Sequence, residues 1–300
     1  MPARSIAAAR PGAGRALAAL LIGATAIGFS AIFVRFSDVG PSALGFWRMA
    51  FALPFLAAWA LRDRSGKRAA RTAGMPTHAL PWAAVTLAGL AFALDVYLFH
   101  VAVGLTTIAK ASLLGNAAPI MLAAIGILFL GDKPSRMVLG ALALSCVGMA
   151  LLIKPDNLAG GVLLGDLAGM GAAFSYALYL IAIQRARRTG SSAWISLTSS
   201  AICAVACLAV ALLLGETILP QSLHGWLAVI ALGVISHALG QGLITVGLGG
   251  VSPSLAAVVL IYPAMVSTLA AFAVFGEAPT ALQSLGGALI LAALVMARRG

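Results

Sequence analysis

One acidic residue of this sequence, Asp95, lies well inside a long apolar segment that runs from about residue 80 to residue 102. An ionised carboxylate at the centre of a bilayer costs about 2.5–3.5 kcal/mol, so the side chain needs a partner inside the protein or a bound proton. Candidate partners are His100 on the same segment, His237 and Lys110. Asp95 therefore fits two roles, a carboxylate that carries a coupling proton or a structural contact between helices, and the sequence leaves both open.

A second group of polar residues recurs at the spacing of one helical turn. His237, Gln241 and Thr245 are four residues apart in an otherwise apolar segment, so they share one face of a helix. A polar face within a membrane must contact water or another helix. We expect His237 and Gln241 to line a substrate cavity. The other polar candidates for its wall are Asn116 and the tyrosines Tyr97, Tyr176, Tyr179 and Tyr262.

Two prolines inside apolar segments, Pro119 and Pro263, occupy matched positions 144 residues apart. Proline removes one hydrogen bond from a helix and bends it, which frees the carbonyls of Gly115 and Val259. In hydrocarbon a freed carbonyl is tolerated where it faces protein or a water-filled cavity. Broken helices at equivalent positions of two repeats are typical of transport sites, so this pair predicts a central cavity. Ordinary kinks satisfied by neighbouring helices are the alternative.

Two basic residues, Arg48 and Lys110, lie at a shallow depth in their apolar segments. Both are candidates for the cavity wall, although long basic side chains at this depth can also reach back to the membrane surface. Asp132 and Glu277 each precede a proline that opens the next predicted helix. That position is typical of a carboxylate that caps the helix it precedes.

Motifs of enzymatic chemistry are missing from the sequence. No group of Cys, His and acidic residues has the spacing of a zinc site, and neither the lysine motif of ATP-binding loops nor the motifs of common hydrolases occur. The sequence therefore predicts no metal, no cofactor and no enzyme, and it leaves gradients of ions or substrate as the source of energy.

The elements that position these residues are apolar helices. Of the 300 residues, 62% are hydrophobic and 9% are charged, against about 25% charged residues in soluble domains. The apolar residues form blocks of about 20, the length with which a helix crosses roughly 30 Å of hydrocarbon. We predict an all-α polytopic membrane protein, in which the net charge of +11 reflects topology and not nucleic-acid binding.

Ten apolar windows are predicted to form transmembrane helices. They cover residues 16–36, 42–61, 80–102, 106–129, 135–153, 164–184, 193–214, 223–246, 253–275 and 280–297. With the N-terminus inside, 15 of the 19 Lys and Arg residues fall on cytoplasmic segments, as the positive-inside rule requires. The N-terminus, the C-terminus and the loop 62–79 are therefore expected to be cytoplasmic.

The two halves of the sequence repeat. Phe29-Ser30 matches Phe174-Ser175, and Gly131-Asp132 matches Gly276-Glu277, both at an offset of 145 residues. Each half holds five predicted helices, an odd number, so the halves must cross the membrane in opposite directions. We expect two inverted five-helix repeats, residues 1–153 and 154–300, which is an architecture of secondary transporters.

These features together resemble a known family. The ten windows, the paired Gly-acidic turns, Arg48, Gly165-Asp166 and the segment from Tyr176 to Tyr179 are similar to the EamA-type transporters of the drug/metabolite transporter superfamily. The resemblance covers nearly the whole chain as two tandem copies. It implies a multi-pass carrier of the bacterial inner membrane, usually an exporter of amino acids, other metabolites or toxic compounds. The second copy departs from the first at Arg48, because Ala193 stands 145 residues further on.

The leading hypothesis is a secondary active transporter that exports a small metabolite, an amino acid or a drug-like compound by alternating access, with a proton or another ion as the coupling partner. The alternative is an integral membrane enzyme acting on a lipid-linked substrate, with Asp95 and His237 as acid and base. The expected partners are the small-molecule substrate, the lipid bilayer and, in a homodimer, a second copy of the chain. No nucleic acid is expected.

Overall fold

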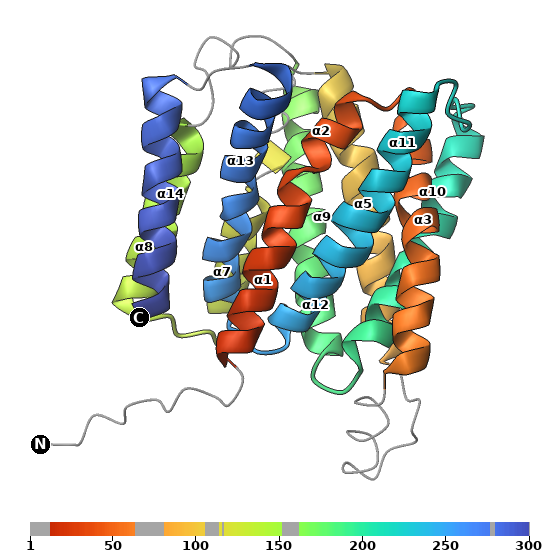
Figure 1. Cartoon of the computed structure of the whole chain (residues 1–300). Helices are drawn as coiled ribbons and strands as arrows, with labels where there is room; N and C mark the ends of the chain where they lie inside the picture. Colours follow the sequence, from red (N-terminus) through yellow and green to blue (C-terminus); the bar gives the residue numbers. More distant parts are fainter. Residues whose placement is uncertain are drawn as a thin grey trace, which may run out of the picture.

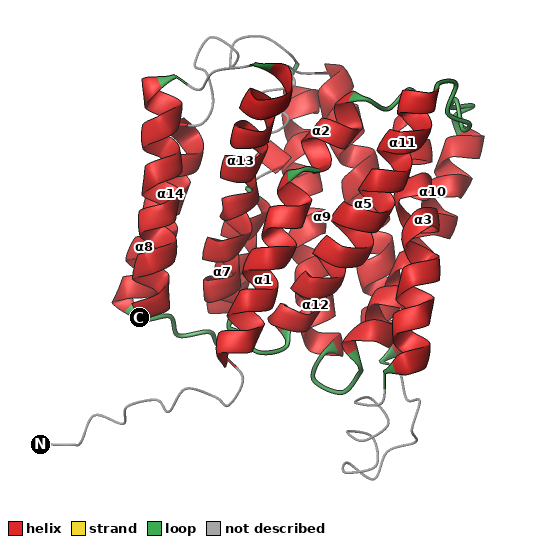
Figure 2. Cartoon of the chain, in the orientation of Figure 1, coloured by secondary structure: helices red, strands yellow, loops and turns green. Residues whose placement is uncertain are grey.

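The computed structural model describes residues 13–63, 81–105, 114–115, 117–151, 162–276 and 280–299. Within these ranges the chain consists of helices and the turns that connect them, as Figure 2 shows. The helices lie side by side in one bundle (Figure 1). The predicted all-helical class is confirmed for this part of the chain.

Six described helices come from the first half of the chain. They are α1 (Ala13–Gly28), α2 (Ser30–Arg35), α3 (Pro41–Arg62), α5 (Trp82–Leu105), α7 (Ala118–Phe129) and α8 (Arg136–Leu151). The second half contributes α9 (Leu163–Ala186), α10 (Ser192–Leu213), α11 (Leu223–Ala231), the π-helix η2 (Leu232–Gln241), α12 (Gly242–Leu248), α13 (Pro253–Phe275) and α14 (Ala281–Arg299).

Eight helical segments among the described residues are long and apolar enough to cross a membrane. Two of these are composite, because α1 continues into α2 and because α11, η2 and α12 follow one another without a gap. α7 and α8 are apolar but have only 12 and 16 residues, fewer than the roughly 20 that a full span needs. The count of ten membrane spans therefore stays a prediction.

The helices pack in pairs that join the two halves of the chain. α3 lies along α10, α5 along α9 and α8 along α14. α1 packs against α13 and against the composite helix of η2 and α12, while α7 contacts both α9 and α13. In Figure 1 the α8–α14 pair forms one edge of the bundle and the α3–α10 pair forms the opposite edge.

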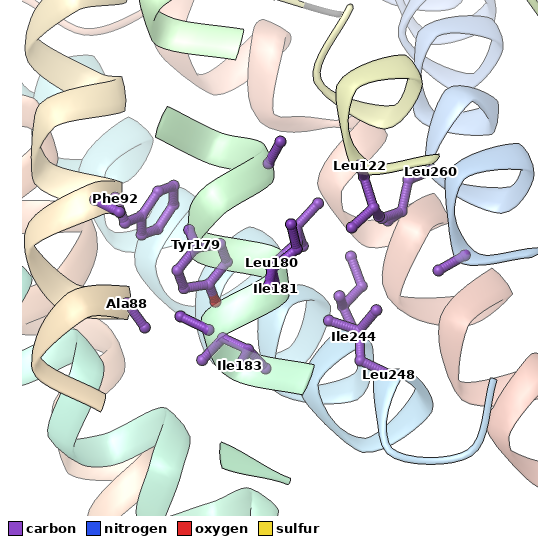
Figure 3. Close-up of a cluster of buried hydrophobic side chains, with 14 of the residues drawn as sticks. Ala88, Phe92, Leu122, Tyr179, Leu180, Ile181, Ile183, Ile244, Leu248 and Leu260 are labelled. Atoms are coloured by element: carbon purple, nitrogen blue, oxygen red, sulfur yellow. The ribbon is translucent and has the colours of Figure 1, made fainter. Parts of the chain in front are cut away.

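The core of the bundle fills the space between α5, α7, α9, α12 and α13. Figure 3 shows Phe92 of α5 beside Tyr179 of α9, and Leu122 of α7 beside Leu260 of α13. The outer faces are also apolar, since Phe129 and Leu213 expose 77% and 85% of their surface. A bundle that is apolar both inside and outside is expected of a protein surrounded by lipid.

Glycines allow the closest approach between α1 and η2. A Cβ atom built on Gly23 would lie 2.6 Å from the Gly240 carbonyl oxygen, so no larger residue fits without a shift of the backbone. Gly131 and Gly276, which the sequence pairs as repeat positions, both adopt a left-handed conformation, with φ of 68° and 69°. Glycine adopts this conformation without the steric cost that a Cβ atom adds.

Candidate functional site

Five helices bring polar and aromatic side chains together in the interior of the bundle. We call this group the central cluster. Its members are Arg48 of α3, Phe92 and Asp95 of α5, Tyr176 and Tyr179 of α9, Ser196 and Ser200 of α10, and His237 and Gln241 of η2. The spacings of three or four residues place members of the same helix on one face.

Stacked rings form the middle of the cluster. The ring of Phe92 lies 4.7 Å from that of Tyr179 and 5.7 Å from that of His237, with interplanar angles of 22° and 16°. Tyr176 continues the stack at 5.6 Å from Tyr179. Phe92 therefore connects the first half of the chain to both α9 and η2, and the stack offers flat apolar surfaces inside a polar site.

Arg48 points into this cluster. Its guanidinium carbon lies 5.3 Å from the centre of the Phe92 ring, a cation–π contact. The charge of Asp95 acts on Arg48, while the Nε atom of Arg48 is buried without a hydrogen-bond partner. This arrangement differs from a side chain that reaches back to the membrane surface.

Hydrogen bonds satisfy only part of the polar side chains. Ser200 Oγ and His237 Nε2 lie 2.7 Å apart, and Gln241 Nε2 donates to the hydroxyl of Tyr179 at 3.0 Å. The buried atoms His237 Nδ1, Gln241 Oε1 and Ser196 Oγ have no hydrogen-bond partner. Buried polar groups are nearly always hydrogen-bonded, so atoms of this kind mark a place where a bound molecule can complete the bonding.

A small cavity lined mostly by polar side chains lies beside the stacked rings. It is lined by Leu56, Tyr179, Ser196, Ser200, His237, Gln241 and Gly242. Its side chains close on one another and leave no space for a substrate in this structure.

The structure gathers six of the residues singled out from the sequence: Arg48, Asp95, Tyr176, Tyr179, His237 and Gln241. The charge that acts on Asp95 comes from Arg48, which was not among its predicted partners. Lys110, Asn116 and the side chain of His100 lie outside the described residues.

The matched prolines belong to α7 and α13, two helices that supply no member of the central cluster. Pro119 stands in the first turn of α7, whereas Pro263 lies inside the continuous helix α13. Their helices pack on each other, and Tyr262 contacts the apolar core there. A further break separates α1 from α2 at Phe29, where Ser267 Oγ donates to the Gly28 carbonyl at 2.5 Å.

Sequence reasoning missed three members of the cluster. Ser196 and Ser200 are four residues apart in an apolar helix, a polar spacing that the sequence displays. Phe92 gives no such signal, because a phenylalanine in an apolar helix is indistinguishable from a packing residue until its neighbours are known. Within the described residues, no three His, Cys, Asp or Glu side chains come together as a metal site.

Comparison with known proteins identifies a family. The model of the EamA-like transporter family matches residues 14–154 and 163–299. An uncharacterized transporter of Archaeoglobus fulgidus is 29% identical over 287 residues, which span 94% of this chain and 96% of that protein. A crystal structure that is 21% identical has the same fold with a TM-score of 0.78 and covers 94% of this chain and 98% of its own.

Proposed function

The chain belongs to the EamA-like transporter family and is a multi-pass membrane transporter, and we propose that it exports a small metabolite by alternating access. The central cluster is the proposed substrate site. The observation that carries this proposal is the set of buried polar atoms on Arg48, His237 and Gln241 that have no partner in the closed bundle. Membership in a transporter family favours the transporter hypothesis over the alternative of a membrane enzyme that acts on a lipid-linked substrate.

The chemistry of the central cluster favours a zwitterionic metabolite. The guanidinium of Arg48 suits a carboxylate or another anionic group. Asp95 suits an ammonium group or a proton, and the rings of Phe92 and Tyr176 suit an apolar part of the molecule. We further propose that Asp95 couples export to the proton gradient by exchanging a proton during the cycle.

Helix packing supports two inverted repeats of five helices. In such a repeat the counterparts are α1 and α9, α3 and α10, α5 and the composite helix of η2 and α12, α7 and α13, and α8 and α14. When each helix is replaced by its counterpart, the α5–α9 contact becomes the contact of α1 with η2 and α12. In the same way the α1–α13 contact becomes the α7–α9 contact, while α3–α10, α8–α14 and α7–α13 map onto themselves. All these contacts are present. The matched left-handed Gly131 and Gly276 support the same relation.

Topology and compartment follow from the distribution of basic residues. With 15 of 19 Lys and Arg residues on one side of ten spans, we place both termini in the cytoplasm of a cell whose inner membrane holds the protein. The turns that carry Asp38 and Glu216 then face outwards, and the turn that carries Asp63 faces inwards.

The proposal is tested by export from cells. Overexpressing the wild type in a strain that lacks the native protein should enrich at least one small metabolite in the medium. The Arg48→Gln variant at equal membrane abundance should lose most of this enrichment, because the substrate loses its charged partner. Arg188→Gln is the matched control, since Arg188 is exposed after α9. Equal metabolite profiles of wild type and empty strain would contradict export, and wild-type export by Arg48→Gln would contradict the site.

A further inference from the structure

At each end of the α3–α10 pair, a carboxylate from one helix meets the beginning of the other. Glu216 follows the end of α10, and its Oε2 accepts a hydrogen bond of 2.9 Å from the backbone N–H of Ala43 in the first turn of α3. Asp63 directly follows α3, and its Oδ2 accepts a hydrogen bond from the hydroxyl of Ser191, the residue before the first turn of α10. We call these contacts the Glu216 lock and the Asp63 lock.

Both locks place a carboxylate at the beginning of a helix, although the donor is a backbone N–H for Glu216 and a side-chain hydroxyl for Asp63. The first N–H groups of a helix have no partner within the helix, and the helix dipole makes this end positive, so a carboxylate there is favourable. A hydrogen bond to an ionised group is stronger than one between neutral groups. Each lock joins residues of different halves, 173 residues apart for Glu216 and 128 for Asp63.

The turns around the Glu216 lock are held together by further bonds. Asp38 Oδ2 accepts from the N–H of Gln221 at 3.1 Å and from the N–H and hydroxyl of Ser222 at 2.9 and 2.7 Å. The indole N–H of Trp47 donates to the carbonyl of Ile218 at 2.7 Å. The turn between α2 and α3 is thereby fastened to the connection between α10 and α11.

The turn beside the Asp63 lock is fastened in a comparable way. Arg187 Nη1 donates to the Gly190 carbonyl at 2.6 Å, and its Nε donates to the Thr245 carbonyl of α12 at 3.2 Å. The charge of Asp63 acts on Arg187. The turn that precedes α10 is therefore connected both to α3 and to the composite helix that carries His237.

The central cluster lies between the two locks, because α3 carries Arg48 and α10 carries Ser196 and Ser200 between their ends. Both locks are made in this structure, and the small cavity beside the stack has no room for a substrate. We infer that the Glu216 lock and the Asp63 lock are the gates of the carrier, each closing one face of the site. This inference rests on the proposed alternating access. Releasing one lock while the other holds opens the cluster to a single side of the membrane.

Accessibility of a thiol in the cluster tests the inference. Cys146, Cys203 and Cys207 are first replaced by Ala, and Ser196→Cys is introduced as the reporter because Ser196 lines the cavity. A membrane-impermeant maleimide then labels this thiol in intact cells and in inverted membrane vesicles. Glu216→Ala should raise the ratio of outside to inside labelling rates about tenfold, and Asp63→Ala should lower it by a similar factor, the size expected for one charge-assisted bond.

Asp132→Ala is the matched control. Asp132 Oδ2 also accepts from a backbone N–H near the start of a helix, that of Ser254 in α13, at 3.0 Å. This contact lies outside the α3–α10 pair, so its loss should leave the labelling ratio unchanged. Glu216→Gln and Asp63→Asn keep the side-chain shape without the charge, and they should produce smaller shifts in the same two directions if the alanine variants do not accumulate.

The labelling results distinguish failure of the lock inference from failure of the proposed transport function. Shifts of the two variants in the same direction, or shifts no larger than that of Asp132→Ala, would overturn the lock inference while labelling of the reporter from both sides still supports alternating access. Labelling from one side only, in every variant, would overturn the proposed function and the gates with it. If Glu216→Ala lowers the ratio of outside to inside labelling rates and Asp63→Ala raises it, the locks are supported and the proposed membrane topology is reversed.

Discussion

A basic and an acidic residue, Arg48 and Asp95, share the interior of the bundle. Arg48 rests on the ring of Phe92, which lies three residues before Asp95 on α5, and the charge of each residue acts on the other. An aromatic face and an opposite charge both lower the cost of keeping a guanidinium away from water. If the central cluster is the substrate site as proposed, a bound substrate or proton would change this balance, and the pair would respond to the transport cycle.

Asp95→Asn should separate folding from coupling. The amide is nearly the same size and is uncharged, so it mimics the protonated carboxyl, and membrane abundance should stay near that of the wild type. Export should persist but lose its dependence on the proton gradient, measured as substrate efflux from vesicles with and without an imposed pH difference. An unchanged gradient dependence would remove Asp95 from coupling, and absence of the variant from the membrane would assign it a structural role.

The residue types of the site were partly readable from the sequence. His237 and Gln241 stand out because polar residues at helical spacing are expensive in an apolar segment. Arg48 was ambiguous, because depth alone cannot decide between the membrane surface and the interior. Phe92 was hidden, since its role depends on which helices face each other and not on local pattern.

At the scale of elements, the helix that carries His237 is not a regular α-helix. Residues Leu232–Gln241 form the π-helix η2 between α11 and α12, and π-helical turns are rare and frequent at functional sites. The spacing of four predicted a shared α-helical face, and the wider turn changes how these side chains are offset. Nothing in the residue types distinguishes the two kinds of helix.

Gly23→Ala should destabilise the contact between α1 and η2. The added methyl group would lie 2.6 Å from the Gly240 carbonyl oxygen and 3.0 Å from the Ile244 nitrogen, and such overpacking costs about 1–3 kcal/mol. Thermal unfolding in detergent should show a lower midpoint. Gly14→Ala is the control, because a methyl group added there in α1 would meet no neighbouring atom within 4 Å, and it should be neutral or slightly stabilising. Equal midpoints for both variants would contradict the close approach.

The Asp38 contact should respond to acid in a defined direction. The hydroxyl of Ser222, followed by backbone N–H groups of Gln221 and Ser222, lowers the pKa of Asp38 below its ordinary value. A carboxyl whose pKa is lower in the folded state stabilises the fold above its unfolded pKa of about 3.9 and loses this contribution as the pH falls through the folded value. Ser222→Ala should therefore move the acid-induced loss of stability to higher pH.

A second serine provides the control for this measurement. Ser222 also accepts from the N–H of Gly225 at the start of α11, so its loss lowers stability at every pH. Ser252 caps α13 by accepting from the N–H of Leu255, and it belongs to a different turn from the one that Asp38 fastens. Ser252→Ala should lower the midpoint of thermal unfolding without changing its pH dependence. A parallel pH profile for both variants would show that Ser222 does not act through Asp38.

Asp132 caps a helix that is distant in the sequence and not the helix that follows it. The sequence predicted that Asp132 caps the helix it precedes, but its carboxylate accepts from Ser254 of α13, and Ser135 caps α8 instead. The local prediction was wrong for that helix because the packing of the bundle brings the start of α13 beside the turn before α8. Only the tertiary structure determines which of the two helix beginnings the Asp132 carboxylate binds.

For the whole molecule, the main prediction is its direction in the membrane. Reporters active only in the periplasm or only in the cytoplasm, fused after Gly74 and after Gly300, should both report the cytoplasm, because 15 of 19 Lys and Arg residues lie on that side of the predicted spans. A fusion after Gly215, in the turn beyond α10, should report the opposite side. Periplasmic activity at Gly74 or Gly300 would contradict the ten-span arrangement.

Eight of the ten predicted membrane helices match a described segment of the required length, because apolar length is a whole-segment property that survives local irregularity. Eight segments have the length and hydropathy of a span. The breaks within them were harder to predict, since the interruption at Phe29 between α1 and α2 involves no proline and is supported by Ser267 from the other half. The motif pairs indicated the repeat, but the partners of each helix emerge only from packing.

The exchange of carboxylates between α3 and α10 also constrains how the chain is made. The ribosome completes α3 well before it reaches Glu216. The Ala43 N–H at the beginning of α3 therefore has no carboxylate acceptor until a further 173 residues have been synthesised. Asp63 meets Ser191 somewhat sooner, after 128 residues. During synthesis the first half must therefore remain in the membrane with one helix start uncapped, and each half is completed by a residue that the other half supplies.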